Sequence, residues 1–243
     1  MDAILTAGGI PEPGDPLYEY TLGENKALVD IAGKPMIQWV LDALCEAKSV
    51  DSVTIVGLPE NGDLTCRKPV TFVPGHGSML NNIRVGVTTL LESKPGVDHV
   101  LAVSSDIPAI RPEMVDWLVG AVHETDEDLY YTVIPRAVME ARFPTSRRSY
   151  VKLKDMQVCG GDMNALRASL VTQNEELWER IVAARKNMFK QAALIGIDTL
   201  FLLLLRRITL ERGVNMVTSR LHLDGRAIVC PYAEVGMDVD KPH

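Results

Sequence analysis

The chain has 243 residues, 47% of them apolar, which is enough for a sizeable buried core without disulfide bonds. Its formal net charge of −7 argues against a nucleic-acid-binding surface, because such surfaces carry an excess of basic residues. The four cysteines are scattered without metal-ligand spacing, and this favours reduced thiols in a cytoplasmic protein: Cys45, Cys66, Cys159 and Cys230.

Short apolar runs alternate with helical patterns over the first half of the chain, which predicts βαβ units and a mainly parallel sheet. The first strand, "DAILTA", ends at Gly8 and Gly9. Residues 10–26 contain three prolines and two further glycines and are predicted to form a long loop, of a length that is usually functional or disordered. Further strands are predicted at 52–58, 70–73, 98–110 and 128–135, and helices at 34–47, 78–93 and 112–124.

The second half of the chain has a different character. Residues 142–155 are basic and predicted to be extended, and "CGGDMNALR" is predicted to be a glycine turn leading into a helix. Residues 173–220 have a helical pattern throughout, with Leu202–Leu205 in the core, and we interpret them as a helical insertion on one side of the sheet in a single domain, 1–243. A last strand is predicted at 225–232.

The most apolar segment, "ALIGIDTLFLLLLRR", is interrupted by Asp198 and is shorter than the roughly 20 apolar residues that a membrane span needs. A buried helix is therefore expected rather than a span. The same segment suits a contact in a homodimer or an apolar ligand equally well.

Three features follow predicted strands at their carboxyl ends, where open α/β sheets bind ligands. They are the turn at Gly8 and Gly9, the carboxylate of Asp106, and the pair Asp238 and Asp240. In an extended backbone, Asp238 and Asp240 point to the same face, so they repel each other unless a cation or a hydrogen-bond network intervenes.

Adjacent glycines allow backbone amides to approach a phosphate, although a Gly-Gly pair is more often only a turn. The sequence matches neither GxGxxG nor GxxxxGK[ST], which disfavours those two nucleotide-binding classes. Lys26 can meet phosphates as a point charge, whereas a lone lysine without context is usually a solvated surface residue.

Asp106 together with Asp238 or Asp240 would form a hard oxygen site suited to Mg²⁺. A polar turn at the two tail aspartates is about as probable on spacing alone. The stretch "TSRRSYVKLK" concentrates basic residues in an acidic protein, which fits an anionic second substrate; an edge strand protected by lysines explains it equally well. Its basic residues are Arg147, Arg148, Lys152 and Lys154.

The ordered segments "ILTAGG", "NKALVDIAGKPMIQWVLDAL", "GHGSMLNNIRVGV", "HVLAVSSDIPAI" and "GMDVDKP" together resemble nucleotidyltransferases of the molybdenum cofactor guanylyltransferase-like group. The resemblance covers residues 1–135 and the last fifteen residues. It implies an α/β fold, a three-layer Rossmann-like architecture of the glycosyltransferase-A type, with a mixed, mainly parallel sheet and a helical insertion.

The resemblance also implies residue roles. Ala7, Gly8, Gly9 and Lys26 would bind base and triphosphate, and Lys26 and Asp106 would be catalytic. Mg²⁺ would be held by Asp106 with Asp238 or Asp240. The remaining implied contacts are to the nucleotide, by Gly77, Ser78 and Asn82, and to the acceptor, by Gly160, Gly161 and Asp162.

One departure concerns the loop before Lys26, where this family typically has an arginine and residues 10–25 contain none. Either a distant cation, such as Arg147 or Arg148, replaces it, or the activity is weak or altered.

The leading hypothesis is Mg²⁺-dependent transfer of NMP from an NTP to a phosphorylated small-molecule acceptor with release of pyrophosphate. The alternatives are a glycosyltransferase that uses an NDP-sugar and a nucleotide-binding domain without catalysis.

Overall fold

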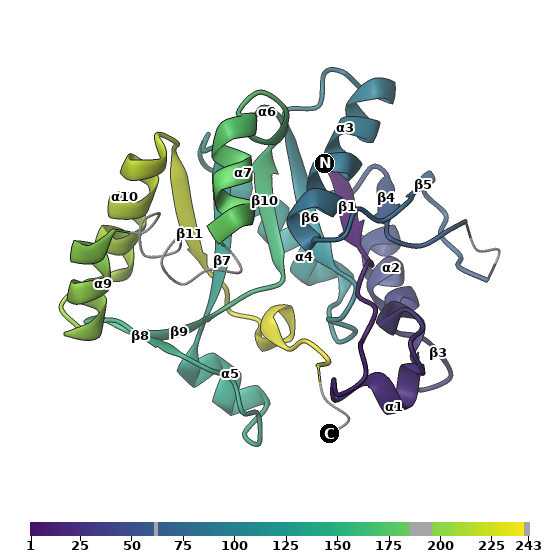
Figure 1. Ribbon diagram of the computed structural model, residues 1–243, viewed down its shortest axis with the longest axis horizontal. Helices are drawn as coiled ribbons and strands as arrows, with labels where there is room; N and C mark the ends of the chain where they lie inside the picture. Colours follow the sequence, from purple (N-terminus) through teal and green to yellow (C-terminus); the bar gives the residue numbers. More distant parts are fainter. Residues whose placement is uncertain (61–62, 185–195, 241–243) are drawn as a thin grey trace.

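A nine-stranded mixed sheet forms the centre of the computed structural model, which describes residues 1–60, 63–184 and 196–240. The strand order is β5-β4-β1-β6-β10-β7-β9-β8, with β11 also paired to β7 (Figure 1). The strands of this sheet are β1 Asp2–Thr6, β4 Val53–Val56, β5 Val70–Val73, β6 His99–Ser104, β7 Leu129–Pro135, β8 Val151–Lys152, β9 Gln157–Gly160, β10 Met163–Arg167 and β11 Gly225–Val229. A separate two-stranded sheet pairs β2 Asp30–Ile31 with β3 Lys34–Pro35.

Helices cover both faces of the large sheet (Figure 1). The α-helices are α1 Tyr18–Thr21, α2 Met36–Glu46, α3 Met79–Ser93, α4 Pro112–Val122, α5 Arg136–Arg142, α6 Ala168–Thr172, α7 Glu175–Ala184, α9 Ile197–Leu204 and α10 Leu210–Leu221. Two 3₁₀ turns complete the described elements, η1 Lys26–Leu28 and η2 Ala233–Gly236.

The pairing confirms the predicted fold class, a mixed and mainly parallel sheet between helices. Strand β1 pairs in parallel with β4 and β6, and β7 pairs in parallel with β11. Strands β9 and β10 run against the others, and β10 lies between β6 and β7.

Alternating side chains of the strands build two cores, one on each face of the sheet. Leu5, Leu101 and Val103 face the cluster that contains the buried residues of α2 and α4. Ile4 and Val100 face the opposite cluster, with α3 and α6. Because the strands are buried on both faces, they read as continuous apolar runs, as is usual for parallel sheets.

The register of the parallel strands brings three loop segments to one edge of the sheet. Thr6 pairs with both Val56 and Ser104, so the chain leaves β1, β4 and β6 at the same level. The glycines after β1 and Asp106 after β6 consequently lie side by side. The C-terminal tail and the loop before η1 run along the same edge at the bottom of Figure 1.

Strand β10 corrects the predicted helix after the Gly160–Gly161 turn. Met163 and Ala165 are buried in one core, while Leu166 is buried in the other, so both faces of this segment are covered. Met, Ala, Leu and Arg are good helix formers. Pairing with β6 and β7 overrides that local preference.

Two other regions also differ from the prediction. The long loop at 10–26 contains the short helix α1, and helix α5 directly follows β7. Strand β8 ends at Lys152, so Lys154 lies beyond the strand.

The leucine run at 202–205 is not core in the described structure, because Leu204 is 79% exposed and Leu205 45% exposed. Part of the predicted helical insertion, residues 185–195, lies outside the described residues. No helix among those the structure describes is long and apolar enough to cross a membrane.

Two helical glycines, Gly86 of α3 and Gly120 of α4, offer a test of how α3 packs on the sheet. A Cβ at Gly86 would lie 2.7 Å from Ile4 Cγ2 and 2.9 Å from Val56 Cγ2, whereas nothing lies within 4 Å at Gly120. We expect Gly86→Ala to lower the free energy of unfolding by about 1–3 kcal/mol through overpacking. Gly120→Ala should raise it by about 0.5–1 kcal/mol through helix propensity. Urea unfolding of both variants checks this, and a stabilised Gly86→Ala protein would contradict the packing.

Candidate functional site

The glycine turn after β1 is held by close backbone packing. Gly57, which follows β4, has φ +112°, and a Cβ there would lie 2.5 Å from both the Cα and the N of Gly8. The Asn25 side-chain amide donates hydrogen bonds to the carbonyl oxygens of Ala7 and Gly57, the latter at 3.2 Å. Three segments distant in sequence are therefore fixed together with no side chain between the two glycines.

The N-terminus of α3 closes the same turn from the other side. Ser78 Oγ accepts a hydrogen bond from Asn81 N at 3.2 Å and so caps the helix. The buried Asn82 accepts a hydrogen bond from His76 N at 2.7 Å, and its amide nitrogen occupies the space that a Cβ of Gly8 would need. Gly77 has φ +80°, a conformation that glycine adopts without strain.

Lys26 joins the glycine turn to the carboxylates. Its backbone N donates to Gly9 O at 2.8 Å, and its Nζ lies 2.5 Å from Asp106 Oδ2 and 3.3 Å from Asp240 Oδ1. Burial lowers the pKa of Lys26, but the charges and hydrogen bonds of Asp106 and then Asp240 outweigh it, and the pKa is raised. The side chain is therefore a firmly charged ammonium group.

The C-terminal tail folds back onto the loop after β6. Val239 N donates to Asp106 O at 2.8 Å. Asp106, Asp238 and Asp240 each offer a carboxylate oxygen within 4.8 Å of the others. The structure thus brings together the three carboxylates that the sequence places after two separate strands.

Arg148 is the second cation of this edge. It forms an ion pair with Asp238, and its Nη2 lies 3.9 Å from Asp162 Oδ2. Only 24% of its side-chain surface is exposed, so the side chain is largely shielded from solvent. It enters the site from the segment between α5 and β8.

Asp162 lies in the turn between β9 and β10. Its N donates to Val235 O at 2.9 Å and its O accepts from Ser104 N at 2.9 Å, so the turn is tied to both neighbouring segments. Burial and then the charge of Asp106 raise the pKa of Asp162 to about 6, against the opposing effect of Arg148. The Asp162 carboxyl group is thus partly shielded from solvent, and it lies beside the triad of Asp106, Asp238 and Asp240.

The other predicted acceptor residues divide into two groups. Gly160 ends β9, and Gly161 N donates to Thr132 O at 2.8 Å, so both belong to the edge that carries Asp162. Arg147 and Lys152 are exposed, and no ion pair within the described residues links them to the triad.

Sequence reasoning missed Asn25 and Gly57, which hold the glycine turn. Asn25 also accepts a hydrogen bond from Ala27 N at 2.9 Å and so caps η1, a role typical of asparagine before a helical turn. That pattern was visible in "GENKAL". The contact of Gly57 with Gly8 depends on the pairing of β1 with β4, and no local sequence pattern predicts that contact.

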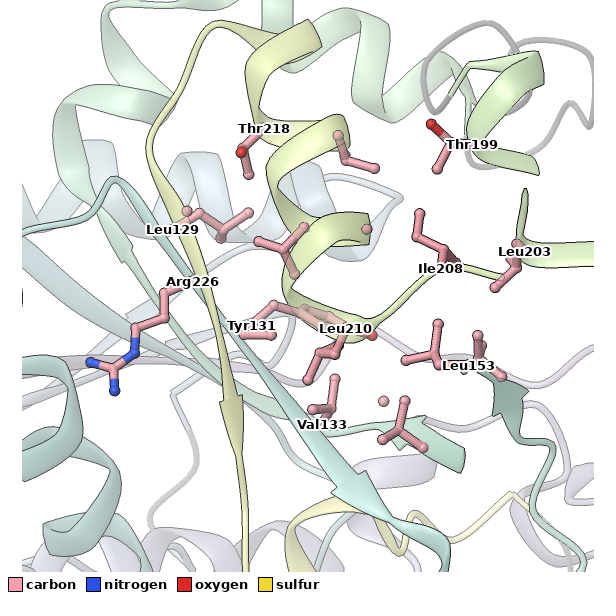
Figure 2. Close-up of a pocket in the computed structure, with 18 of the residues that line it drawn as sticks. Leu129, Tyr131, Val133, Leu153, Thr199, Leu203, Ile208, Leu210, Thr218 and Arg226 are labelled. Atoms are coloured by element: carbon pink, nitrogen blue, oxygen red, sulfur yellow. The ribbon is translucent and has the colours of Figure 1, made fainter. Parts of the chain in front are cut away.

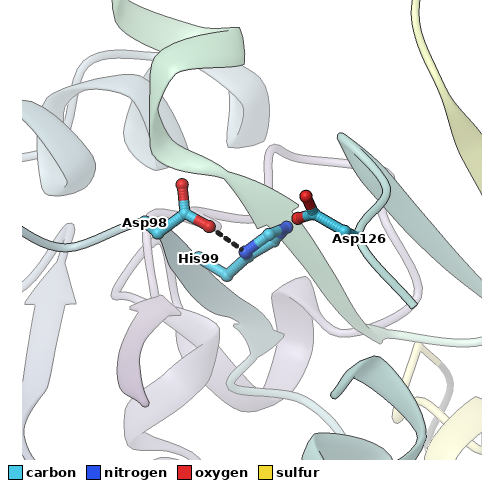
Figure 3. Close-up of side chains that lie close together, drawn as sticks. All are labelled: Asp98, His99 and Asp126. Atoms are coloured by element: carbon cyan, nitrogen blue, oxygen red, sulfur yellow. Dashed lines mark ion pairs between the residues drawn. The ribbon is translucent and has the colours of Figure 1, made fainter. Parts of the chain in front are cut away.

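A second acidic cluster lies at the opposite end of β6 (Figure 3). His99 Nδ1 lies 2.8 Å from Asp98 Oδ2, and Asp126 is on the other side of the imidazole. Arg167 already contacts this cluster, at 2.8 Å from Asp98, 2.6 Å from Asp126 and 3.0 Å from Asp128. A guanidinium thus supplies the positive charge, and the cluster has the character of a structural ion network.

Comparisons with known proteins add the following findings. A family model described as the MobA-like NTP transferase domain matches residues 21–222. A probable molybdenum cofactor guanylyltransferase of Pyrococcus horikoshii is 29% identical over 97 residues, 40% of this chain and 47% of that protein. A 3-deoxy-manno-octulosonate cytidylyltransferase of Zea mays is 28% identical over 131 residues, 54% of this chain and 44% of that protein. The chain spans about half the length of these curated relatives.

Solved structures resemble the whole chain. A hypothetical transferase from Thermus thermophilus has a TM-score of 0.84 and 32% identity, covering 99% of this chain and 96% of that one. A 4-diphosphocytidyl-2C-methyl-D-erythritol synthase has a TM-score of 0.58 at 15% identity, covering 99% of this chain and 92% of that one, a likeness of fold alone.

The raised pKa of Asp162 predicts a pH-dependent effect of its neutralisation on stability. The unfolded carboxyl titrates near 3.8 and the folded one near 6, so the folded state carries a penalty that grows between these values and is complete above pH 6. In metal-free protein, Asp162→Asn should raise the free energy of unfolding by about 1–2 kcal/mol at pH 7.5, a value reduced for partial solvent exposure. The gain should shrink as the pH falls toward 4.

Urea unfolding at pH 7.5 and 4.5 measures this difference. The same change at the exposed Asp224 serves as the control and should alter stability by less than about 0.5 kcal/mol. An equal gain at both pH values would mean that the Asp162 charge is not the cause.

Proposed function

The chain belongs to the family of MobA-like NTP transferase domains, and we propose that it transfers a nucleoside monophosphate from an NTP to a phosphorylated small-molecule acceptor, releasing pyrophosphate. The observation that carries this proposal is the meeting of Asp106, Asp238 and Asp240 beside Lys26 and the glycine turn. Metal-binding acids, a cation and exposed backbone amides are the groups that nucleotidyl transfer requires in one place.

The nucleotide half of the proposed site is the edge between β1, β4 and α3. Ala7, Gly8 and Gly9 present backbone to the phosphates, and the bare Gly8–Gly57 contact leaves no side chain to obstruct them. Lys26 would meet the triphosphate, since its backbone is tied to Gly9. On the α3 side the proposed base contacts are Gly77, Ser78 and Asn82.

The acceptor half is the edge formed by the Gly160–Asp162 turn and Arg148. Arg148 lies between Asp238 and Asp162, where it can hold a phosphate monoester beside the triad of Asp106, Asp238 and Asp240. Arg147 and Lys152 are exposed and would contribute only long-range positive charge.

The triad fits a divalent ion. Asp106 Oδ1 is buried and has no hydrogen-bond partner in the described part of the chain, so its lone pairs are available to a cation. Mg²⁺ is usually bound through one or two carboxylates together with substrate phosphates and water, and the triad offers enough carboxylates for this. Bound there by Asp106 with Asp238 and Asp240, Mg²⁺ would neutralise charge on the triphosphate.

The proposed reaction forms a bond between an acceptor phosphate oxygen and the α-phosphorus and breaks the bond between that phosphorus and the oxygen bridging to the β-phosphate. The acceptor oxygen is already ionised at neutral pH, so no general base is required. The residues contribute by alignment and by placing Lys26 and Arg148 next to the oxygens on which negative charge grows.

The test of this proposal is pyrophosphate release with each of the four NTPs, with Mg²⁺ and with EDTA, against a panel of phosphate monoesters. We expect release with one NTP and one acceptor class only when Mg²⁺ is present. Activity from NDP-sugars and none from NTPs would indicate the glycosyltransferase alternative. NTP binding by calorimetry without turnover of any acceptor would indicate a non-catalytic domain.

Substitution of Asp106 gives a second prediction. Asp106→Asn keeps the shape of the side chain but removes a metal-binding charge, and we expect turnover to fall by at least about 100-fold. Circular dichroism and thermal unfolding should show that the fold is retained. The matched control is Asp224→Asn, and full Mg²⁺-dependent activity in Asp106→Asn would contradict the metal assignment.

A further inference from the structure

An apolar cavity of about 360 Å³ lies between the sheet and helix α10 (Figure 2). Tyr131 and Val133 of β7 form its floor, and Val214 and Val217 of α10 form its roof. Ile208 and Leu203, on the α9 side, close one end. None of the nucleotide-binding groups proposed above lines it.

The polar groups in the walls of the cavity are largely engaged elsewhere. Thr199 Oγ1 accepts a hydrogen bond from Arg220 at 2.7 Å, and Thr218 Oγ1 donates to Asn215 O at 3.4 Å. Arg226 pairs with Glu124 at 3.3 Å. A polar ligand would lose its hydration without replacement here, so the cavity selects an apolar occupant.

One end of the cavity reaches the acceptor edge of the site. Cys159 and Gly160 of β9 line the cavity, and the turn to Asp162 follows directly. The Tyr131 hydroxyl occupies the space that a Cβ of Gly160 would need, so the ring lies against this strand. Burial and then the charge of Asp162 raise the pKa of Tyr131, while Arg148 opposes them. The phenol therefore stands between the apolar cavity and the charged groups.

We propose that the cavity holds the apolar substituent of the acceptor, whose phosphate lies at Arg148. The acceptor class is then the phosphate monoester of an apolar alcohol. The inference rests on the proposed nucleotidyl transfer and adds the substrate class. Its basis is continuity: Tyr131 and Gly160 line the apolar cavity, and the charge of the half-buried Arg148 acts on Tyr131, which matches a ligand with a charged head and an apolar chain.

Calorimetric titration of decyl phosphate and ethyl phosphate into the full chain, without nucleotide and below the micelle-forming concentration, tests this directly. We expect decyl phosphate to bind at least about 30-fold more tightly, because several methylene groups leave water. Val214→Trp fills the cavity and should reduce this ratio to below about 3. Arg148→Ala should weaken both ligands and leave the ratio unchanged.

The matched control is Asn215→Trp, which adds the same bulk on the exposed side of α10 and should keep the full ratio. Gly213→Leu is a second cavity-filling variant, since a Cβ there meets only Ile208 Cδ1 at 3.6 Å and Cγ1 at 3.8 Å. It should also lower the ratio, so the test stands even if Val214→Trp does not fold. Thermal unfolding checks each variant.

Equal binding of the two phosphates, or a ratio unchanged by both cavity-filling variants, would overturn the inference. A change of oligomeric state in Val214→Trp, with no change in the ratio, would show instead that this region is a contact between copies.

Failure of the proposed function has a different signature. Pyrophosphate release with short polar acceptors and no chain-length effect would remove the inference alone, whereas a chain-length effect on binding with no release from any NTP would remove the function alone.

Discussion

The repulsion among four carboxylates gathered at one edge of the sheet is the constraint around which this part of the molecule is organised. Asp106, Asp162, Asp238 and Asp240 come from three separate segments, and two cations hold them together. Lys26 bridges Asp106 and Asp240, while Arg148 pairs with Asp238 and faces Asp162. Each cation also brings its own segment, the loop after Gly9 or the segment before β8, to the edge.

The same interactions explain why the site has two halves. Lys26 is tied through its backbone to Gly9, so its charge belongs to the side where the glycine turn lies. Arg148 comes from the segment between α5 and β8, which follows the other half of the sheet. Its charge therefore belongs to the side where Asp162 and the cavity lie. The carboxylates between them are shared by the two proposed halves, the nucleotide side and the acceptor side.

Much of this arrangement could be predicted from sequence because it follows from the parallel strands. The family resemblance and the fold class are confirmed, and the rule that ligands lie at strand carboxyl ends led to Gly8, Gly9 and Asp106. The rest depends on long-range pairing. Strand β10 has the composition of a helix, and Gly57 gains its importance only because β4 lies against β1. Leu204 and Leu205 appeared to be core because composition does not reveal which side of a helix is covered.

The reversed strand β10 has a consequence for how such a protein can change. Among the described strands, β10 is the one that lies between β6 and β7. The half of the sheet that carries the glycine turn and the half that carries the apolar cavity are therefore joined through this one strand. Under the proposed function, new side chains beyond β10 could alter which acceptor is bound without disturbing the groups assigned to the donor. Under that function, the recipient could therefore change while the energy-rich donor stays the same.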